Sequence, residues 1–338
     1  MKWDLNDIVL IPSEKSYVNS RSSCSCKYNK TMLPLMASPM DTVVSTDNYL
    51  EYISKKIMPC LPRGNYISRY RGKHFQSYGL QEIEYQLNSE DNNINYFYHH
   101  KNVLIDIANG HMAKLLPLIK EIKEKYPHII LMVGNIANPE TFINLGMAGA
   151  DYVRCSVGTG AGCTTAANVS INYPLGSLIS ECYELRKQYD LKTKIVADGG
   201  MKNYSDIIKA LAIGADYVMI GSLFNKAIES AGFNYLWKIK INNNIAKTLW
   251  KWGFPVKKKY RGMSTKAVQR SWGKSKLVTA EGITKYQKIE YTLGHWIENF
   301  EDYLKSAMSY CNATTLEDFI GKAEYIFITD ASRKRFEK

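Results

Sequence analysis

The feature that most constrains the fold is a regular alternation of short apolar runs and longer segments with helical spacing, which begins near Asn102. The apolar runs predict strands at residues 103–105, 129–133, 152–155, 194–197 and 217–220. The segments between them predict helices at residues 112–125, 139–147, 175–189 and 205–213. Strands that alternate with helices in this way form βα units, which build a parallel sheet.

Further elements are expected on both sides of this alternation. Strands are predicted at residues 33–37 and 57–61, with a helix at 43–56 between them. Near the end of the sequence, residues 298–310 and 315–322 have helical spacing, and residues 325–329 form a late strand candidate.

Polar or glycine residues follow almost every predicted strand at its carboxyl end: Ser38, Asp106, Asn135, the loop at Gly158, Asp198 and Gly221. A (β/α)8 barrel builds its active site from the loops at this end of its strands. A doubly wound sheet would instead gather its ligands at one switch point. The expected fold is therefore α/β, a (β/α)8 TIM barrel, with residues 1–338 forming one catalytic domain.

A glycine-rich loop follows the strand predicted at residues 152–155. Glycines at 158, 160 and 162 let the backbone turn, and the loop ends at Cys163, followed by two threonines. A thiol in a polar, backbone-lined loop forms a thiolate more easily than one in an apolar core, so we expect Cys163 to be a nucleophile. The alternative, equally open on this loop alone, is an inert buried cysteine.

Two later strands end in glycines that leave backbone N–H groups free for a phosphate. These are Asp198-Gly199-Gly200 and Gly221-Ser222. The loops after the last strands of a barrel commonly hold a phosphate in this way. Asp198 could also accept hydrogen bonds from ribose hydroxyls. The alternative is that both sites are ordinary tight turns.

Two long segments have no clear pattern. Residues 63–100 are polar and irregular, and are expected to be a flexible segment. Residues 240–290 also lack regular elements and are expected to form an active-site flap, with a surface insertion as the alternative.

Composition limits the classes of function. Seven cysteines in a chain of 338 residues suggest free thiols in a reducing compartment, and no secretory signal or membrane-spanning run is visible. A cytoplasmic location is expected. The net charge of +12 fits a phosphorylated substrate or a solvated basic surface. Nucleic-acid binding is the minor interpretation, because no linear motif for it accompanies the charge.

Together these motifs resemble the family of IMP dehydrogenases and GMP reductases, and the resemblance covers most of the chain. The matching segments are residues 19–22, 38–43, 106–110, 134–135, 149–151, the cysteine loop, 197–200, 218–222, 260–264 and 281–282. The family fold is a (β/α)8 barrel, usually tetrameric, so a homotetramer and a purine nucleoside monophosphate substrate are implied.

The resemblance also implies roles for individual residues. Cys163 would attack C2 of the purine, and Thr165 with Glu281 would handle ammonia in a reductase. The substrate would contact Ser38, Met40, Asp198, Gly200, Gly221, Ser222, Tyr260, Gly262 and Met263. The NADPH or NAD cofactor would contact Asp106, Asn109 and Gly158. Carbonyl oxygens of Gly158, Gly160 and Cys163 could bind K⁺, as in similar dehydrogenases.

The sequence departs from the family pattern at three positions. Ala161 stands where a serine is usual, Ala166 where an arginine is usual, and Arg63 where a lysine is usual. The first change removes one phosphate donor, and together they make the detailed site map less certain than the family resemblance.

The resemblance leaves two reactions open. The residues of several motifs are closer to those of the dehydrogenases, which oxidise IMP to XMP. Dehydrogenases use an Arg-Tyr pair on a long flap to activate water. Here the segment after Met263 is shorter, with only 269–272 in the corresponding place, and residues 63–100 are too few for the usual regulatory module. We therefore favour a GMP reductase, with IMP dehydrogenase as the alternative and Arg270 as its makeshift base.

Two readings from other classes remain. One is a non-catalytic nucleotide-binding barrel, which the presence of Cys163, Thr165 and Glu281 disfavours. The other is an unrelated phosphate-binding flavin enzyme, in which the cysteine loop has no role.

Overall fold

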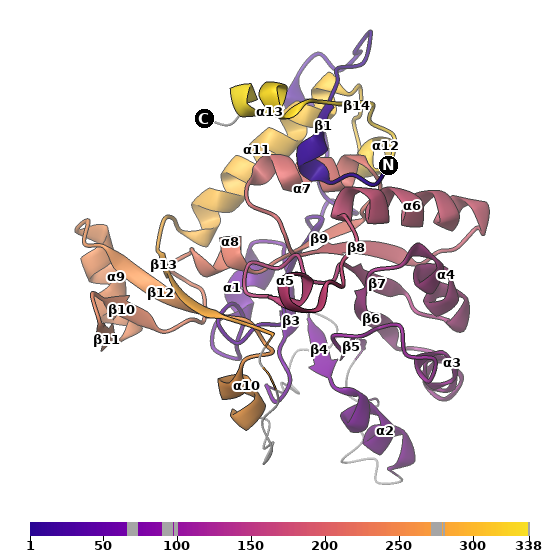
Figure 1. Ribbon diagram of the computed structural model, residues 1–338. Helices are drawn as coiled ribbons and strands as arrows, with labels where there is room; N and C mark the ends of the chain where they lie inside the picture. The colour runs from indigo at the N-terminus through magenta and orange to yellow at the C-terminus, as the bar shows by residue number, and fades with distance from the viewer. Residues whose placement is uncertain (66–73, 90–96, 98–100, 272–278, 280, 337–338) are drawn as a thin grey trace.

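The computed structural model describes residues 1–65, 74–89, 97, 101–271, 279 and 281–336. Within them, eight parallel strands follow one another in chain order and close into a barrel (Figure 1). The strands are β2 (Leu35–Ala37), β3 (Met58–Leu61), β4 (Phe75–Tyr78), β5 (Asn102–Asp106), β6 (Ile130–Ile136), β7 (Tyr152–Cys155), β8 (Lys194–Asp198) and β9 (Tyr217–Ile220). Pairing of β2 with β9 closes the ring, with Met36 opposite Met219. The predicted (β/α)8 barrel is confirmed.

Helices surround this barrel and alternate with its strands (Figure 1). They are α1 (Tyr49–Ser54), α2 (Leu80–Asn88), α3 (Leu115–Lys125), α4 (Pro139–Ala148), α6 (Leu175–Gln188), α7 (Tyr204–Ala212), the short α8 (Ser222–Asn225) and α11 (Leu293–Tyr310). The ends of α4 show how individual residues determine where a helix begins and ends. Asn138 caps its first turn by accepting from the Glu140 N–H, and Gly149 ends it in the left-handed conformation, at φ 111°.

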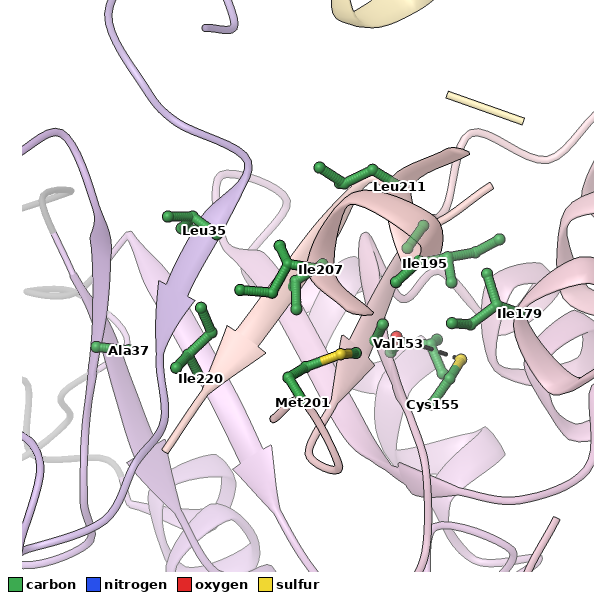
Figure 2. Close-up of a cluster of buried hydrophobic side chains, with 14 of the residues drawn as sticks. Leu35, Ala37, Val153, Cys155, Ile179, Ile195, Met201, Ile207, Leu211 and Ile220 are labelled. Atoms are coloured by element: carbon green, nitrogen blue, oxygen red, sulfur yellow. Dashed lines mark hydrogen bonds between the residues drawn. The ribbon is translucent and has the colours of Figure 1, made fainter. Parts of the chain in front are cut away.

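The barrel strands bury side chains on both sides. Side chains that point inward fill the barrel: Met36, Cys60, Phe75, Leu104, Met132, Val196 and Met219. Side chains that point outward pack against the helices. In Figure 2, Val153 and Ile195 of the strands face Ile179 of α6, and Ile207 and Leu211 of α7 lie in the same cluster. Strands buried on both faces need near-continuous apolar runs, which explains why most of them were visible in the sequence.

Residues 63–100 differ from the prediction of an irregular segment. They contain strand β4 of the barrel and helix α2, so the prediction is wrong for residues 75–88. The strand lacks an apolar run because Gln76 and Ser77 occupy its middle, and both are fully buried. The predicted flexibility falls mostly on residues 66–73, 90–96 and 98–100, which lie outside the described residues.

Residues 240–290 also contain regular elements, which corrects the expectation of a patternless flap. A four-stranded antiparallel sheet, in the order β11-β10-β12-β13, projects from the barrel at the left of Figure 1. Its strands are β10 (Asn234–Leu236), β11 (Ile239–Ile241), β12 (Val256–Arg261) and β13 (Thr284–Lys288), and its helices are α9 (Asn243–Lys251) and α10 (Lys266–Ser271). One face packs on α9 through Val256, Ala246 and Leu249. Strand β12 escaped prediction because it has lysines on both faces.

The two ends of the described chain meet on one side of the barrel. Strand β1 (Ile8–Leu10) pairs antiparallel with β14 (Tyr325–Phe327), which confirms the late strand. The remaining short elements are η1 (Leu5–Asp7), η2 (Arg21–Ser23), α5 (Thr165–Val169), α12 (Leu316–Phe319) and α13 (Asp330–Phe336). In the part of the chain that the structure describes, no helix is both long and apolar enough to cross a membrane.

Phe75 tests whether β4 is part of the core. Its ring is 1% exposed and packs edge-on against Tyr152, at 5.5 Å between ring centroids. We expect Phe75→Ala to lower the free energy of unfolding by about 3–5 kcal/mol, measured by urea denaturation. Tyr85→Ala, on the exposed side of α2, is the control and should change it by less than about 0.5 kcal/mol. Equal, small effects of the two changes would contradict the assignment.

Lys258 gives a pH-dependent prediction. It is fully buried on the α9 side of β12, and its amino group donates to the carbonyl of Ser230. Burial lowers the pKa of this lysine to about 7, despite an opposing effect of Glu229. Below pH 7 the folded protein holds a buried cation, which lowers the free energy of unfolding. This destabilisation disappears as the pH rises towards the pKa that Lys258 has in the unfolded chain. We expect Lys258→Met to be more stable than the wild type by roughly 3–5 kcal/mol at pH 6, with the difference shrinking by pH 10 in urea titrations. A difference that does not vary with pH would contradict this.

Candidate active site

One cavity of about 490 Å³ opens at the carboxyl ends of the barrel strands, and every site residue expected from the sequence lines it. These residues are Ser38, Met40, Asp106, Asn109, Gly158, Gly160, Cys163, Thr165, Asp198, Gly200, Gly221, Ser222, Tyr260, Gly262, Met263 and Glu281. The volume is within the range of sites that hold small molecules and cofactors. The structure thus brings together segments from nearly the whole length of the chain.

Cys163 belongs to a chain of three side chains that can carry a proton. Its Sγ lies 3.2 Å from Oγ1 of Thr165, to which the thiol donates. The Thr165 hydroxyl in turn donates to Oε2 of Glu281 at 2.5 Å. A thiol, a hydroxyl and a carboxylate in series allow the thiol proton to move to the carboxylate, which leaves a thiolate facing the cavity. Cys163 is half-buried, so the sulfur is accessible to a ligand.

Backbone contacts hold the cysteine loop against the segment that carries Glu281. The Thr164 N–H donates to the Glu281 carbonyl at 2.8 Å, and the Ile283 N–H donates to the Gly162 carbonyl at 3.0 Å. Gly262 lies against the same loop, and a Cβ at that position would be 2.3 Å from the Gly162 oxygen. Glycine is therefore required at 262 for the three segments to meet.

A buried cation lies at the floor of the cavity. Arg154 of β7 donates to Asp106 Oδ1 at 2.5 Å and to Asp198 Oδ2 at 2.8 Å, with a second bond from its Nε to Asp198 at 3.1 Å. Asn135 also donates to Asp198, at 2.7 Å. Burial opposes the charge of Arg154, but Asp198 and Asp106 outweigh it, so the pKa of the guanidinium is raised. It stays charged and fixes both carboxylates.

Tyr260 forms part of the cavity wall beside the cysteine loop, where a Cβ at Gly162 would lie 3.1 Å from its ring. Its hydroxyl donates to the sulfur of Met40 at 3.6 Å. Burial, followed by the nearby Asp198 and Cys163, raises the pKa of this phenol, so the ring enters the site neutral and able to donate a hydrogen bond. Its hydroxyl would also lie 3.3 Å from a Cβ at Gly221, so glycine leaves room between this ring and β9.

The cofactor residues predicted from the sequence line the cavity from the end of β5 and from the segments that follow β5 and β7. Asp106 ends β5, and its backbone carbonyl accepts a hydrogen bond from Arg63. Gly158 has a φ of +82°, and a Cβ there would lie 2.7 Å from that of Ala166. The alanine that replaces the usual arginine therefore packs directly against the glycine loop.

Arg154 and Gln269 line the cavity but were not predicted as site residues from the sequence. Asn135, expected at a strand end, and Arg63, a departure from the family pattern, also line it. Arg154 carried a visible signal, because it is the only charged residue in an otherwise apolar strand. Gln269 carried none. Its neighbour Arg270, the base suggested for a dehydrogenase, is exposed and is not among the lining residues, and Trp272 falls outside the described residues.

The side chains that line the cavity offer few ligands for a metal ion. Among the described residues, no cluster of three or more His, Cys, Asp or Glu side chains is placed to hold a metal ion. The carbonyl oxygen of Gly160 accepts the Cys163 N–H at 2.8 Å, which leaves it one lone pair for a monovalent cation. The set of three carbonyl ligands thus stays a prediction.

A (β/α)8 barrel with an accessible free cysteine in the cavity at the carboxyl ends of its strands defines a class of enzyme, and comparison with known proteins specifies the family. The family model for the IMP dehydrogenase / GMP reductase domain matches residues 98–337. This chain belongs to the IMP dehydrogenase / GMP reductase family.

The relatives of this chain include proteins named IMP dehydrogenase and proteins named GMP reductase. Inosine-5'-monophosphate dehydrogenase of Chlorobaculum tepidum is 33% identical over 68% of this chain and 45% of the relative, so the chain spans about half the length of such relatives. GMP reductase of Lactobacillus delbrueckii subsp. bulgaricus is 29% identical over 96% of this chain and 94% of the relative. GMP reductase 2 of Bos taurus is 25% identical over 99% and 97%.

Arg154→Leu tests the ion network at the cavity floor. The change leaves Asp106 and Asp198 buried without their cation, and we expect the free energy of unfolding to fall by about 3–5 kcal/mol. Urea denaturation measures the loss. Arg21→Leu, which breaks an exposed pair with Asp302, is the control and should cost under about 1 kcal/mol. A loss no larger than that of the control would count against the network.

Proposed function

We propose that this chain is a GMP reductase, which converts GMP to IMP and ammonia with a reduced nicotinamide cofactor. The observation that carries the proposal is the hydrogen-bonded series Cys163–Thr165–Glu281. It supplies a nucleophile and a route for one proton. Reductive deamination needs both, since the cysteine must displace an amine that leaves only as ammonia. The relatives that align along almost the whole chain, which are named GMP reductases, support the same reaction.

The first step forms a bond between Sγ of Cys163 and C2 of the purine. The thiol proton passes to Glu281 through Thr165 and then returns to the amino group at C2. The C–N bond breaks, ammonia leaves, and a covalent thioether at C2 remains. Atoms balance, because one thiol and one amine become one C–S bond and one ammonia. Thr165 acts at both stages, since its hydroxyl contacts the sulfur and the carboxylate.

The second step replaces sulfur by hydrogen. A reduced nicotinamide supplies a hydride to C2 when it is bound. The C–S bond breaks, Cys163 leaves as a thiolate, and a proton from solvent through Glu281 and Thr165 restores the thiol. Asp106 and Asn109 lie on the β5 side of the cavity, where they would orient the cofactor. The fixed carboxylate of Asp106, held by Arg154, suits a hydroxyl group of such a ligand.

The rest of the cavity would hold the nucleotide. Asp198, fixed by Arg154 and Asn135, has the lone pairs to accept ribose hydroxyls. Gly200, Gly221 and Ser222 would place backbone N–H groups on the phosphate, and Tyr260 would donate its hydroxyl. Ser38, Met40, Gly262 and Met263 would surround the base.

IMP dehydrogenase is the second candidate, and the relatives with higher identity over a shorter aligned stretch favour it. Hydrolysis of its covalent adduct needs a base that activates water. Arg270 is exposed outside the cavity, and the described residues offer no Arg-Tyr pair there. This arrangement favours the reductase. K⁺ bound by carbonyl oxygens of Gly158, Gly160 and Cys163 would belong to the dehydrogenase alternative.

We further propose a single catalytic domain, NADPH as the preferred cofactor, a homotetramer and a cytoplasmic location. All seven cysteines are free in the structure, which agrees with a reducing compartment. A non-catalytic nucleotide-binding barrel would have no use for the proton route at Cys163.

Absorbance at the reduced-nicotinamide band separates these functions. One cuvette holds the protein with GMP and NADPH, and the other holds it with IMP, NAD⁺ and K⁺. We expect absorbance to fall in the first and to stay constant in the second. A rise in the second alone would establish the dehydrogenase, and no change in either would support the non-catalytic barrel.

Cys163→Ala tests the covalent mechanism. We expect it to abolish turnover, by at least about a thousandfold, because Cys163 is the only cysteine among the described residues that line the cavity, while GMP binding measured by calorimetry stays within about threefold. Cys311→Ala, a half-buried thiol outside the cavity, is the matched control and should keep full turnover. Turnover that survives in Cys163→Ala would exclude the covalent step.

A further inference from the structure

One face of the β10–β13 sheet points away from α9. The pairing register of the strands places lysine and aromatic side chains together on this face. Cross-strand partners in an antiparallel sheet point to the same face. Lys240 is opposite Tyr235, Tyr235 is opposite Lys257, and Lys257 is opposite Lys288. One row across all four strands therefore reads lysine, tyrosine, lysine, lysine.

A second row lies beside the first on the same face. The Lys259 N–H donates to the Phe233 carbonyl at 2.9 Å, which extends the β10–β12 pairing, and Lys259 is opposite Tyr286. The rings of Phe233 and Tyr286 are 54% and 52% exposed. We call these seven residues the basic-aromatic face: Phe233, Tyr235, Lys240, Lys257, Lys259, Tyr286 and Lys288.

Contacts between the rows confirm that these side chains share one surface. The amino group of Lys240 lies 3.5 Å from the centroid of the Phe233 ring. The rings of Tyr235 and Tyr286 meet edge to face, with centroids 5.0 Å apart. Lysine amino groups and aromatic rings therefore lie side by side on this face.

The charges on this face are not balanced within the described part of the chain, where none of its four lysines has an ion pair. Like charges directly opposite one another, as at Lys257 and Lys288, destabilise a sheet. The lysines of this face repel one another, and an anionic partner would relieve that repulsion, so the face is electrostatically complementary to such a partner.

The aromatic rings narrow the choice of anion. A single strand of nucleic acid offers phosphates for lysines and base faces that stack on exposed rings, in alternation. Neighbouring strands are about 4.8 Å apart, so a row of four spans roughly 14 Å, enough for two or three nucleotides. Two copies of this face would repel each other, because each carries four lysines, and the face has no aliphatic side chain to enter a lipid surface.

We propose that the basic-aromatic face binds single-stranded nucleic acid. No linear motif in the sequence indicates this, because the seven residues come from four separate strands and meet only through the pairing register. The proposal does not rest on the proposed reductase activity. The buried face of the same sheet points Tyr260 towards the catalytic cavity, whereas the basic-aromatic face points to solvent.

Fluorescence anisotropy with a labelled oligothymidylate of about twelve nucleotides tests the proposal. Saturating GMP is present throughout, so that the catalytic cavity is blocked. We expect the wild type to bind with an affinity that falls as KCl rises. Lys257→Gln/Lys288→Gln should weaken binding about tenfold or more and reduce the slope of log affinity against log salt by about 1.4. Tyr286→Ala should weaken binding about tenfold.

Matched substitutions elsewhere on the surface serve as controls. Lys120→Gln/Lys322→Gln removes two exposed lysines, and Tyr310→Ala removes a ring that is 64% exposed. These variants should bind like the wild type, and all variants should keep its circular dichroism spectrum. Equal affinity of face and control variants, or no binding by the wild type, would overturn the proposal. So would face substitutions that dissociate an oligomer in analytical ultracentrifugation without changing oligonucleotide affinity, since the face would then be a subunit contact.

Discussion

The guanidinium of Arg154 is the interaction on which the catalytic end of this barrel depends. It joins Asp106 at the end of β5 to Asp198 at the end of β8, and so ties together strands that are not neighbours in the barrel. A buried arginine paired with two carboxylates is expensive to break, because each group left alone would be an uncompensated charge. Both carboxylates are thereby held rigid at the floor of the cavity.

Around this fixed floor, the reactive part of the site is assembled from segments far apart in sequence. Thr165 and Glu281 are 116 residues apart, yet their side chains are in hydrogen-bonding contact. The backbone bonds of Thr164 and Gly162 bring the two segments together, and glycine at 262 lets them approach. The proposed nucleophile and its proposed proton acceptor thus form one unit that depends on main-chain packing rather than on the two side chains alone.

Sequence patterns predicted the barrel where its strands are apolar on both faces, and failed where they are not. Strand β4 was missed because Gln76 and Ser77 are buried without being apolar, and β12 because Lys258 is buried among exposed lysines. The cavity residues came from loops whose glycines and acids mark strand ends, and from the resemblance that linked them. The ion network could not be predicted, because a linear pattern does not show that Arg154 reaches carboxylates on two other strands.

The two strands that carry most of the basic-aromatic face run directly into the catalytic segments. Gly262 follows the end of β12, and Ile283, which precedes β13, continues the same ladder by accepting the Gly262 N–H at 3.0 Å. Gly282 then pairs with Cys163 itself. The peripheral sheet and the nucleophile therefore share one continuous hydrogen-bonded ribbon. Such continuity provides a path for thermodynamic coupling, in which a ligand on the sheet and a nucleotide in the barrel would change each other's affinity by the same factor.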